Sequence, residues 1–260
     1  MTADLFARLH DYYDQNGIGA EGFDCHHLDE CRGTCTTFSK AKEAYVGDRY
    51  GADGLPRLVF LSLDSGDGGG QWHSSAEEAA RARTLEAVQA HENGLDIVAY
   101  AKSHPGYQIH HWYQTHELAL ALLGKLRGAL EIGSIHRYFA HTNSAKCCLN
   151  NPKRSEADAR LFRNCRGFIP RELEILEPDI LVTQGRWAKV AVSKGFPGAL
   201  AQVSRAGGVA VNYRKVTLPD REIIWFHSYH PRFGGYWRQK RRDWPLWTGV
   251  VRARFGNGKV

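Results

Sequence analysis

Two short apolar runs, separated in the chain by helical patterns, constrain the fold most strongly. Residues 58–63 and 179–183 each have the length and composition of a buried strand. Helical patterns lie between them, at residues 74–92, 115–130 and 155–176. Helices that alternate with apolar strands predict an α/β protein with a parallel or mostly parallel sheet.

Shorter patterns complete the predicted elements. A break is expected inside the 155–176 helix, near Gly167 and Pro170. Further helices are predicted at residues 2–15 and 187–193, and further strands at residues 135–141, 209–213 and 222–226. The Cys- and His-rich segment 25–35 is predicted to be a loop, and the pattern of residues 93–116 favours no element.

Three loops follow predicted strands, at residues 64–70, 142–148 and 229–231. In parallel sheets the ligand crevice lies at the carboxyl ends of the strands, so these loops should share one edge. Asp64 opens the first loop, where a carboxylate activates water or stabilises a positive charge. The alternative is that Asp64 only caps the following turn.

The other two loops carry binding and donor groups. Asn143 offers an acceptor and two donors, which suit the edge of a base, and Lys146 suits a phosphate. Pro231 fixes the backbone after His230, whose ring can then donate to a leaving group that gains negative charge. Taken singly, a residue such as Asn143 is more often a turn residue than a reader of a base, and one such as His230 is more often an ordinary histidine at a strand end.

A basic and aromatic stretch near the C-terminus indicates an anionic partner. The chain has a formal net charge of +6 and a pI of about 9.0. Cations neutralise phosphates and aromatic rings stack on bases, so we favour nucleic acid over a solvated basic face. The stretch contains Arg232, Phe233, Tyr236, Trp237, Arg238, Lys240, Arg241, Arg242 and Trp244.

The cysteines predict a metal or cluster site rather than disulfides. The chain begins without an apolar signal core and no apolar run approaches the roughly 20 residues that span a membrane, so we expect a cytoplasmic protein with reduced thiols. Cys31, Cys35, Cys147 and Cys165 are the expected ligands of an iron–sulfur cluster, with Cys25 and Cys148 as spares. The alternative is a zinc site formed by Cys25, His26 or His27, Cys31 and Cys35.

These motifs, in this order, resemble the uracil-DNA glycosylase superfamily, most closely its iron–sulfur-containing bacterial and archaeal branches. The resemblance covers most of the chain. It rests on the Cys31–Cys35 pair, the strand into the loop at Asp64, the run from Thr142 to Cys147, Cys165, the segment 173–185, and His230 with Pro231. The first cysteine pair is spaced by three residues rather than two, and Ser65 and Leu63 depart from the usual first loop.

The resemblance implies a fold and a reaction. The fold is a single domain over residues 1–260, with three α/β/α layers around a central, mostly parallel four-stranded sheet. The reaction is removal of a flipped-out uracil or modified pyrimidine from DNA by a monomeric enzyme that leaves an abasic site. A branch that removes modified cytosines from phage DNA, in antiviral defence, fits the altered first loop.

The resemblance also implies residue roles. Asp64 stabilises the sugar cation and orients water, while His230 stabilises the leaving base. Asn143 reads the base and Trp72 stacks on it. The cluster, of the 4Fe–4S type, is structural. The implied DNA contacts are Lys146, Arg232, Phe233, Tyr236, Trp237 and Arg238.

Three other functions are alternatives to the removal of a base from DNA. One is an inactive DNA-binding module on the same fold, and another is a relative that traps DNA covalently. The third is a Mg²⁺-dependent nuclease or phosphatase that uses Asp64 and Asp67. This last function needs a third carboxylate, for which the sequence offers no clear candidate.

Overall fold

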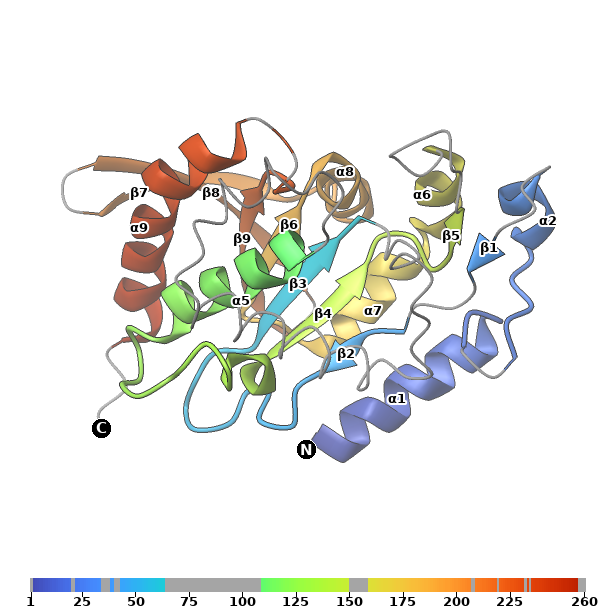
Figure 1. Cartoon of the computed structure of the whole chain (residues 1–260), viewed down its shortest axis with the longest axis horizontal. Coiled ribbons are helices and arrows are strands. Elements are labelled where there is room, and N and C mark those ends of the chain that lie inside the picture. Colours follow the sequence, from blue (N-terminus) through green and yellow to red (C-terminus); the bar gives the residue numbers. More distant parts are fainter. Residues whose placement is uncertain are drawn as a thin grey trace.

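A mixed sheet lies at the centre of the protein (Figure 1). The computed structural model describes residues 2–19, 22–33, 38–39, 43–63, 109–149, 159–206, 209–218, 220–231, 233 and 235–256. Within these ranges the main sheet has seven strands, in the order β2-β4-β3-β6-β9-β8-β7. Their bounds are β2 (Tyr45–Val46), β3 (Leu58–Ser62), β4 (Phe139–Asn143), β6 (Ile180–Gln184), β7 (Leu200–Ala206), β8 (Val209–Thr217) and β9 (Glu222–Ser228).

The four central strands are parallel, and the outer strands are antiparallel. β4 pairs with β3, β3 with β6, and β6 with β9, all in parallel. β2 runs antiparallel to β4, and β7 and β8 form an antiparallel extension of β9. The expected four-stranded sheet is therefore corrected to a wider, mixed sheet. The polar residues of β7 gave no buried-strand pattern, because this strand lies at the sheet edge.

Helices cover both faces of the sheet and give three layers. One core cluster joins Val59 and Leu61 to α1 (Thr2–Gln15), α7 (Phe168–Leu176) and α8 (Arg186–Gly195). The other joins Leu58 and Phe60 to α5 (Ile109–Leu123) and α9 (Tyr236–Phe255). Successive side chains of a strand point to opposite faces, so β3 supplies both clusters and is buried at every residue.

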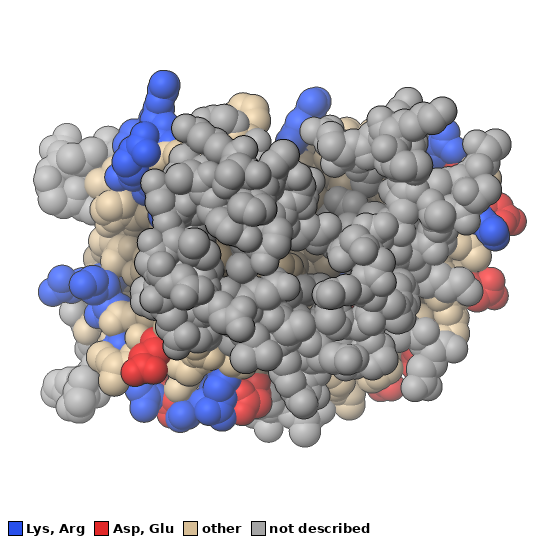
Figure 2. Space-filling model, viewed as in Figure 1, with Lys and Arg blue, Asp and Glu red and all other residues tan. Residues whose placement is uncertain are grey.

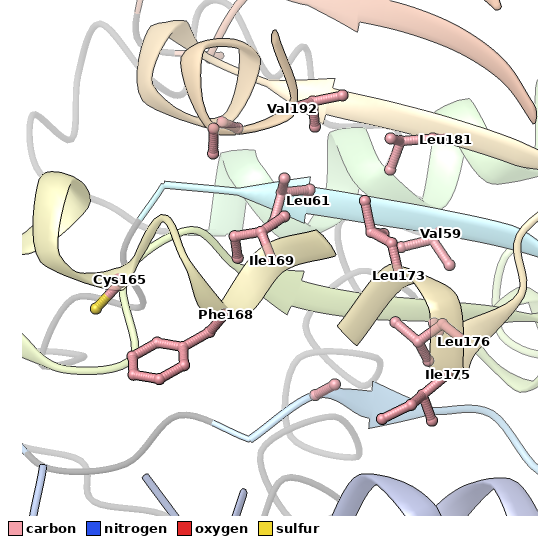
Figure 3. Close-up of a cluster of buried hydrophobic side chains, with 14 of the residues drawn as sticks. Val59, Leu61, Cys165, Phe168, Ile169, Leu173, Ile175, Leu176, Leu181 and Val192 are labelled. Carbon is pink, nitrogen blue, oxygen red and sulfur yellow. The ribbon is translucent and has the colours of Figure 1, made fainter. Parts of the chain in front are cut away.

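The packing of α7 shows how one helix seals a face of the sheet. Ile169 and Leu173 point toward Leu61 and Val59 of β3 (Figure 3), and all four side chains are fully buried. Replacing one such large core side chain by alanine typically costs about 2–5 kcal/mol. This face is therefore a rigid base under the strand ends.

Several predicted helices are confirmed, with shifted bounds. The helix at residues 2–15 matches α1. The 155–176 pattern is split, as expected, into α6 (Ala159–Cys165) and α7. Pro170 lies in the first turn of α7, where its missing N–H costs no helical hydrogen bond. The predicted helix at 74–92 lies outside the described residues.

The remaining small elements flank the sheet. The predicted loop at 25–35 contains the short helix α2 (Leu28–Arg32). A 3₁₀ turn, η2 (Ile135–Tyr138), leads into β4, and β1 (Phe38–Ser39) pairs with β5 (Cys148–Leu149). Within the described ranges, every helix is too short or too polar to cross a membrane.

Candidate active site

The carboxyl ends of the parallel strands bring the predicted site residues to one edge. Ser62, the last residue of β3, is in register with Asn143, the last residue of β4. Gln184 at the end of β6 is likewise in register with Ser228 at the end of β9, two residues before His230. This is the edge at which parallel α/β sheets bind ligands.

The loop that begins at Asn143 is fixed to the end of β3. The Ser144 hydroxyl oxygen lies 2.8 and 3.0 Å from the carbonyl oxygens of Ser62 and Leu63, between which its single proton is shared. The backbone N–H groups of Ser144 and Ala145 donate to the same two carbonyls. Asn143 is nearly buried and is held next to the residue that precedes Asp64. Asp64 and Trp72 themselves lie outside the described residues.

A hydrogen-bond network lies beneath this edge and centres on Ser62. Its hydroxyl donates to Gln184 Oε1 at 2.7 Å, and it contacts His141 Nε2 at 2.8 Å and His111 Nε2 at 3.2 Å. Gln184 Nε2 in turn donates to Thr115 Oγ1 at 3.0 Å. Three strands and α5 are thus joined by their side chains at the strand ends.

His230 lies against α5 as well as at the end of β9. Its ring stacks on that of His111, with 5.1 Å between the ring centroids and 7° between the planes. His111 also contacts His141 edge-on, at 5.9 Å. The site therefore holds three histidine rings, of which the sequence analysis singled out one.

Lys146 does not face a DNA phosphate, which corrects its expected role. Its ammonium group is buried, 2.7 Å from both carboxylate oxygens of Glu172 and 2.9 Å from Thr142 Oγ1. The Tyr13 hydroxyl also donates to Glu172, and burial together with this carboxylate raises the pKa of Tyr13 well above its usual value. Lys146 is part of a buried network that joins α1, the loop after β4 and α7.

The basic and aromatic stretch divides into exposed and buried residues. Phe233 is 58% exposed and packs against Tyr229, at 5.0 Å between ring centroids. Arg238 is exposed and Trp237 is half-buried, whereas Arg232 lies outside the described residues. Tyr236 is only 1% exposed, and its hydroxyl donates to Gln114, so its expected contact with DNA is corrected to a core position.

Side chains of α9 form part of the molecular surface near this site. In Figure 2, Lys and Arg side chains of the described chain lie along the margin where Figure 1 places α9. Arg238 and Arg241 are both exposed on this helix, whereas Lys240 is half-buried and forms an ion pair with Glu117 at 2.6 Å. The described basic surface available to a ligand is therefore smaller than the sequence suggested.

Gln239 connects α9 to the backbone just before His230. Its Nε2 donates to the His227 carbonyl at 2.8 Å, and its Oε1 accepts from the Tyr229 N–H at 2.7 Å. Gln239 is almost fully buried, and both ends of its amide are paired, as buried polar groups usually are. The backbone on both sides of Ser228 is consequently held by one side chain.

Four of the cysteines lie in the core cluster that includes α1, α7 and α8. Cys25, Cys31, Cys147 and Cys165 are buried and free. A hydrogen bond from Cys147 to Cys165 raises the pKa of the Cys147 thiol and lowers that of Cys165, while burial raises the pKa of Cys25 and Cys31. Cys35 lies outside the described residues.

These thiols fit a thiolate-bound group by their chemistry, and three of them are expected ligands. Asn164 Nδ2 donates to Cys31 Sγ and the Lys146 N–H donates to Cys165 Sγ, both at 3.3 Å, as sulfur ligands are commonly supported. In the described part of the chain, no three His, Cys, Asp or Glu side chains are already arranged to hold a metal ion. His27, a ligand in the zinc alternative, has its Nδ1 atom 3.5 Å from Glu30 Oε2.

The family model of the uracil DNA glycosylase superfamily matches residues 82–250, more than half of the chain. The chain belongs to this superfamily. Its members are in general DNA glycosylases, so DNA is the expected partner. No curated protein matches the chain significantly.

The superfamily match contains most of the described site. It includes α5, β4, β6, β9 and most of α9, and therefore both Asn143 and His230. It does not extend to β3, Asp64, Cys31 or Cys35. The expected roles of Asp64, Cys31 and Cys35 rest on the sequence motifs alone, whereas β3 is placed at the site by its parallel pairing with β4 and β6.

Sequence reasoning missed five residues of the network at the strand ends. One signal for two of them was present, since His111 and Thr115 lie in a segment rich in histidine and aromatic residues. Its helical start at Ile109 was not recognised. The missed residues are Ser62, His111, Thr115, His141 and Gln184.

Proposed function

We propose that this protein is a monofunctional DNA glycosylase that hydrolyses the N-glycosidic bond of a flipped-out uracil or modified pyrimidine. The observation that carries the proposal is that Asn143 and His230 lie at the same edge of the sheet, at or just after the ends of parallel strands, and within the superfamily match. Asn143 and His230 are far apart in the sequence, and the parallel strands are what place them at a common edge.

The chemistry assigns complementary tasks to the two ends of the broken bond. As the bond lengthens, the sugar gains positive charge and the base gains negative charge. The Asp64 carboxylate is suited to stabilise the sugar and orient the water whose oxygen bonds to the anomeric carbon. His230 is suited to donate a hydrogen bond to the departing base, and such a donor is typically worth about 3–4 kcal/mol.

Recognition belongs to the groups around these two. The Asn143 amide can pair with the edge of a pyrimidine. Phe233 is the exposed ring best placed near His230 to fill the gap left by a flipped nucleotide, since the Phe233 N–H bonds the His230 carbonyl. Arg238 and Arg241 can bind phosphates. The substrate class we favour is uracil or a modified cytosine, including the modified cytosine of phage DNA.

The thiols support a separate proposal, a structural 4Fe–4S cluster held by Cys31, Cys35, Cys147 and Cys165. Three of these thiols are buried in one region, with Cys25 beside them as the substitute ligand. The cluster would cross-link the N-terminal segment to the loop after β4 and to α6. It takes no part in hydrolysis, which transfers no electrons.

A base-release assay tests the proposed activity. The protein is incubated with uracil-containing DNA, unmodified DNA and phage DNA with hydroxymethylated or glucosylated cytosine, and alkali then reveals abasic sites. We expect strand breaks only after alkali, in EDTA as well as without it, and loss of them in Asp64→Asn and His230→Ala. Asp67→Asn is the matched control and should retain activity.

Other outcomes identify the competing functions. A protein–DNA adduct on a denaturing gel would show a covalently trapping protein. Binding of DNA without abasic sites on any substrate would show an inactive module. Cleavage without alkali that EDTA abolishes would show a metal-dependent nuclease.

A further inference from the structure

The Ser62 network fixes the orientation of His111. The Thr115 hydroxyl donates to the His111 carbonyl at 2.7 Å, so it accepts from Gln184 Nε2 at 3.0 Å. This orients Gln184 Oε1 toward Ser62, which donates to it at 2.7 Å. The alternative bond, from Thr115 to Gln184 Oε1, is longer, at 3.3 Å.

The single proton of the Ser62 hydroxyl then determines which ring nitrogen atoms of His111 and His141 carry a proton. A hydroxyl has one proton and two lone pairs. The proton goes to Gln184, so the two remaining contacts, with His111 Nε2 and His141 Nε2, require N–H groups on both rings. His111 therefore presents its Nε2–H to Ser62, and this bond sets the plane of its ring.

The helix that carries His111 is joined to α9 by polar contacts. Lys240 Nζ contacts Gln114 Oε1 at 2.8 Å and Glu117 at 2.6 Å. The Thr248 hydroxyl oxygen lies 3.1 Å from the Ala121 carbonyl oxygen of α5 and 2.9 Å from the Trp244 carbonyl oxygen of its own helix. α9 also holds the backbone before His230 through Gln239. The same helix thus supports both members of the His111–His230 stack.

We propose that His111 is a positioning residue for His230: the Thr115–Gln184–Ser62 chain holds the His111 ring, and the parallel stack of the two rings holds the His230 imidazole toward the leaving base. The 5.1 Å centroid separation and 7° interplanar angle are those of an offset stack. The activity part of this inference rests on the proposed glycosylase function. The stack itself does not.

The first arm of the test needs no catalysis. Histidine-labelled protein is studied by NMR, and the His230 imidazole signals are assigned from their loss in His230→Ala. His111→Ala should shift these signals, because the ring current of the stacked imidazole is lost. His111→Phe keeps an aromatic ring, so the His230 signals of this variant should lie close to their positions in the unaltered protein. His116→Phe, a buried histidine on the same helix, is the control and should leave the His230 signals in place.

The second arm is a double-mutant cycle on single-turnover base release. Misplacing a group near the reacting atoms can lower the rate of an enzyme on the order of a hundredfold. The His111→Ala variant should therefore release base more slowly, with unchanged affinity for DNA. In the His230→Ala background, His111→Ala should have no further effect, because His111 acts through His230.

Either arm can overturn the proposal. His230 signals that do not move in His111→Ala would show that the stack does not position the ring. Additive rate losses in the cycle would show that His111 acts on the substrate directly. If the unaltered protein releases no base from any DNA, the proposed function fails, and the NMR arm alone decides the role of His111.

Discussion

Among single residues, Lys146 shows most clearly how a folded structure changes the meaning of a charge. In sequence it is a basic residue in a predicted DNA-binding loop, but in the structure it neutralises a buried carboxylate, Glu172. Removing one partner of a buried pair leaves the other charge uncompensated. The pair therefore contributes to folding and leaves DNA affinity to exposed groups.

Lys146→Met should destabilise the protein by about 3–5 kcal/mol, and the Lys146→Met, Glu172→Leu double variant should recover part of that loss. Urea denaturation followed by circular dichroism measures both. The exposed pair Arg171–Glu174 is the matched control, since Arg171→Met should cost little. Equal stability of Lys146→Met and the unaltered protein would contradict a buried ion pair.

His227 should make folding depend on pH. Burial, helped by the positive charge of Lys189, lowers its pKa from 6.5 to about 4. Between these values the unfolded chain binds the proton more tightly, so stability contributed by the neutral ring is present above pH 6.5 and is lost as pH falls toward 4. The full loss is about 3 kcal/mol.

The measurement compares urea midpoints at pH 7.5 and pH 5 for the unaltered protein and His227→Gln. Other groups titrate in both proteins, so the difference between their pH dependences isolates His227. We expect the variant to lose less stability at pH 5. Parallel pH dependences would rule out a depressed pKa at this position.

Among the elements, α9 has two roles that its sequence does not separate. One face packs in the core through Tyr236, Trp244 and Trp247, and the other exposes Arg238 and Arg241. Its aromatic and basic residues were read together as a DNA-binding stretch. The helical period assigns them to different faces.

Arg238→Ala with Arg241→Ala should weaken DNA binding uniformly across sequences. The slope of log affinity against log salt is negative, and each lost phosphate contact makes it less steep by about 0.9. The slope of the double variant should therefore be less steep by about 2. Fluorescence anisotropy over a salt series measures the slope. Arg171→Ala, on the opposite face of the sheet, should leave it unchanged, and an unchanged slope in the double variant would place the phosphate contacts elsewhere.

Gln239→Leu tests the connection between α9 and the strand-end loop. The substitution leaves the Tyr229 N–H and the His227 carbonyl without partners, which typically costs about 1–3 kcal/mol for each buried group. We expect faster amide exchange at Tyr229 than in Gln239→Glu, which keeps the acceptor. Equal protection in the two variants would exclude this role of Gln239.

The element scale also shows what the sequence could predict. Strands β3 and β6 were recognisable because both faces are buried, which gives a continuous apolar run. β7 lies at the edge of the sheet, and α5 begins in a segment of histidines and aromatic residues, so neither has a simple period. Local pattern predicts an element well when its burial is uniform, as in β3 and β6, or follows the helical period, as in α1.

The site followed the same rule. His230 and Asn143 could be proposed from the sequence because a strand end and a following loop place them, and both features are local. Ser62, His141 and Gln184 matter through contacts between elements, which no spacing in the chain expresses. Lys146 was assigned a DNA contact because its partner, Glu172, is distant in sequence.

At the scale of the whole molecule, Cys25 and Cys31 of the N-terminal segment lie in the same core cluster as Cys147 and Cys165. If they hold the proposed cluster, Cys165→Ser should lose bound iron and the visible absorbance shoulder, and should melt at a lower temperature. Elemental analysis and a thermal melt measure this. Cys148→Ser is the control and should keep iron. Stoichiometric zinc without iron in the unaltered protein would favour the zinc alternative.

The order of the elements along the chain has a consequence for biosynthesis. The strand ends that carry the candidate site come from β3, β4, β6 and β9, and α9, which follows all of them, supports both His111 and His230. A ribosome therefore releases the supporting helix after every residue that it holds in place. Under the proposed function, a nascent chain still lacking α9 would have the candidate side chains without the helix that supports them, so partial products of translation should be harmless to DNA.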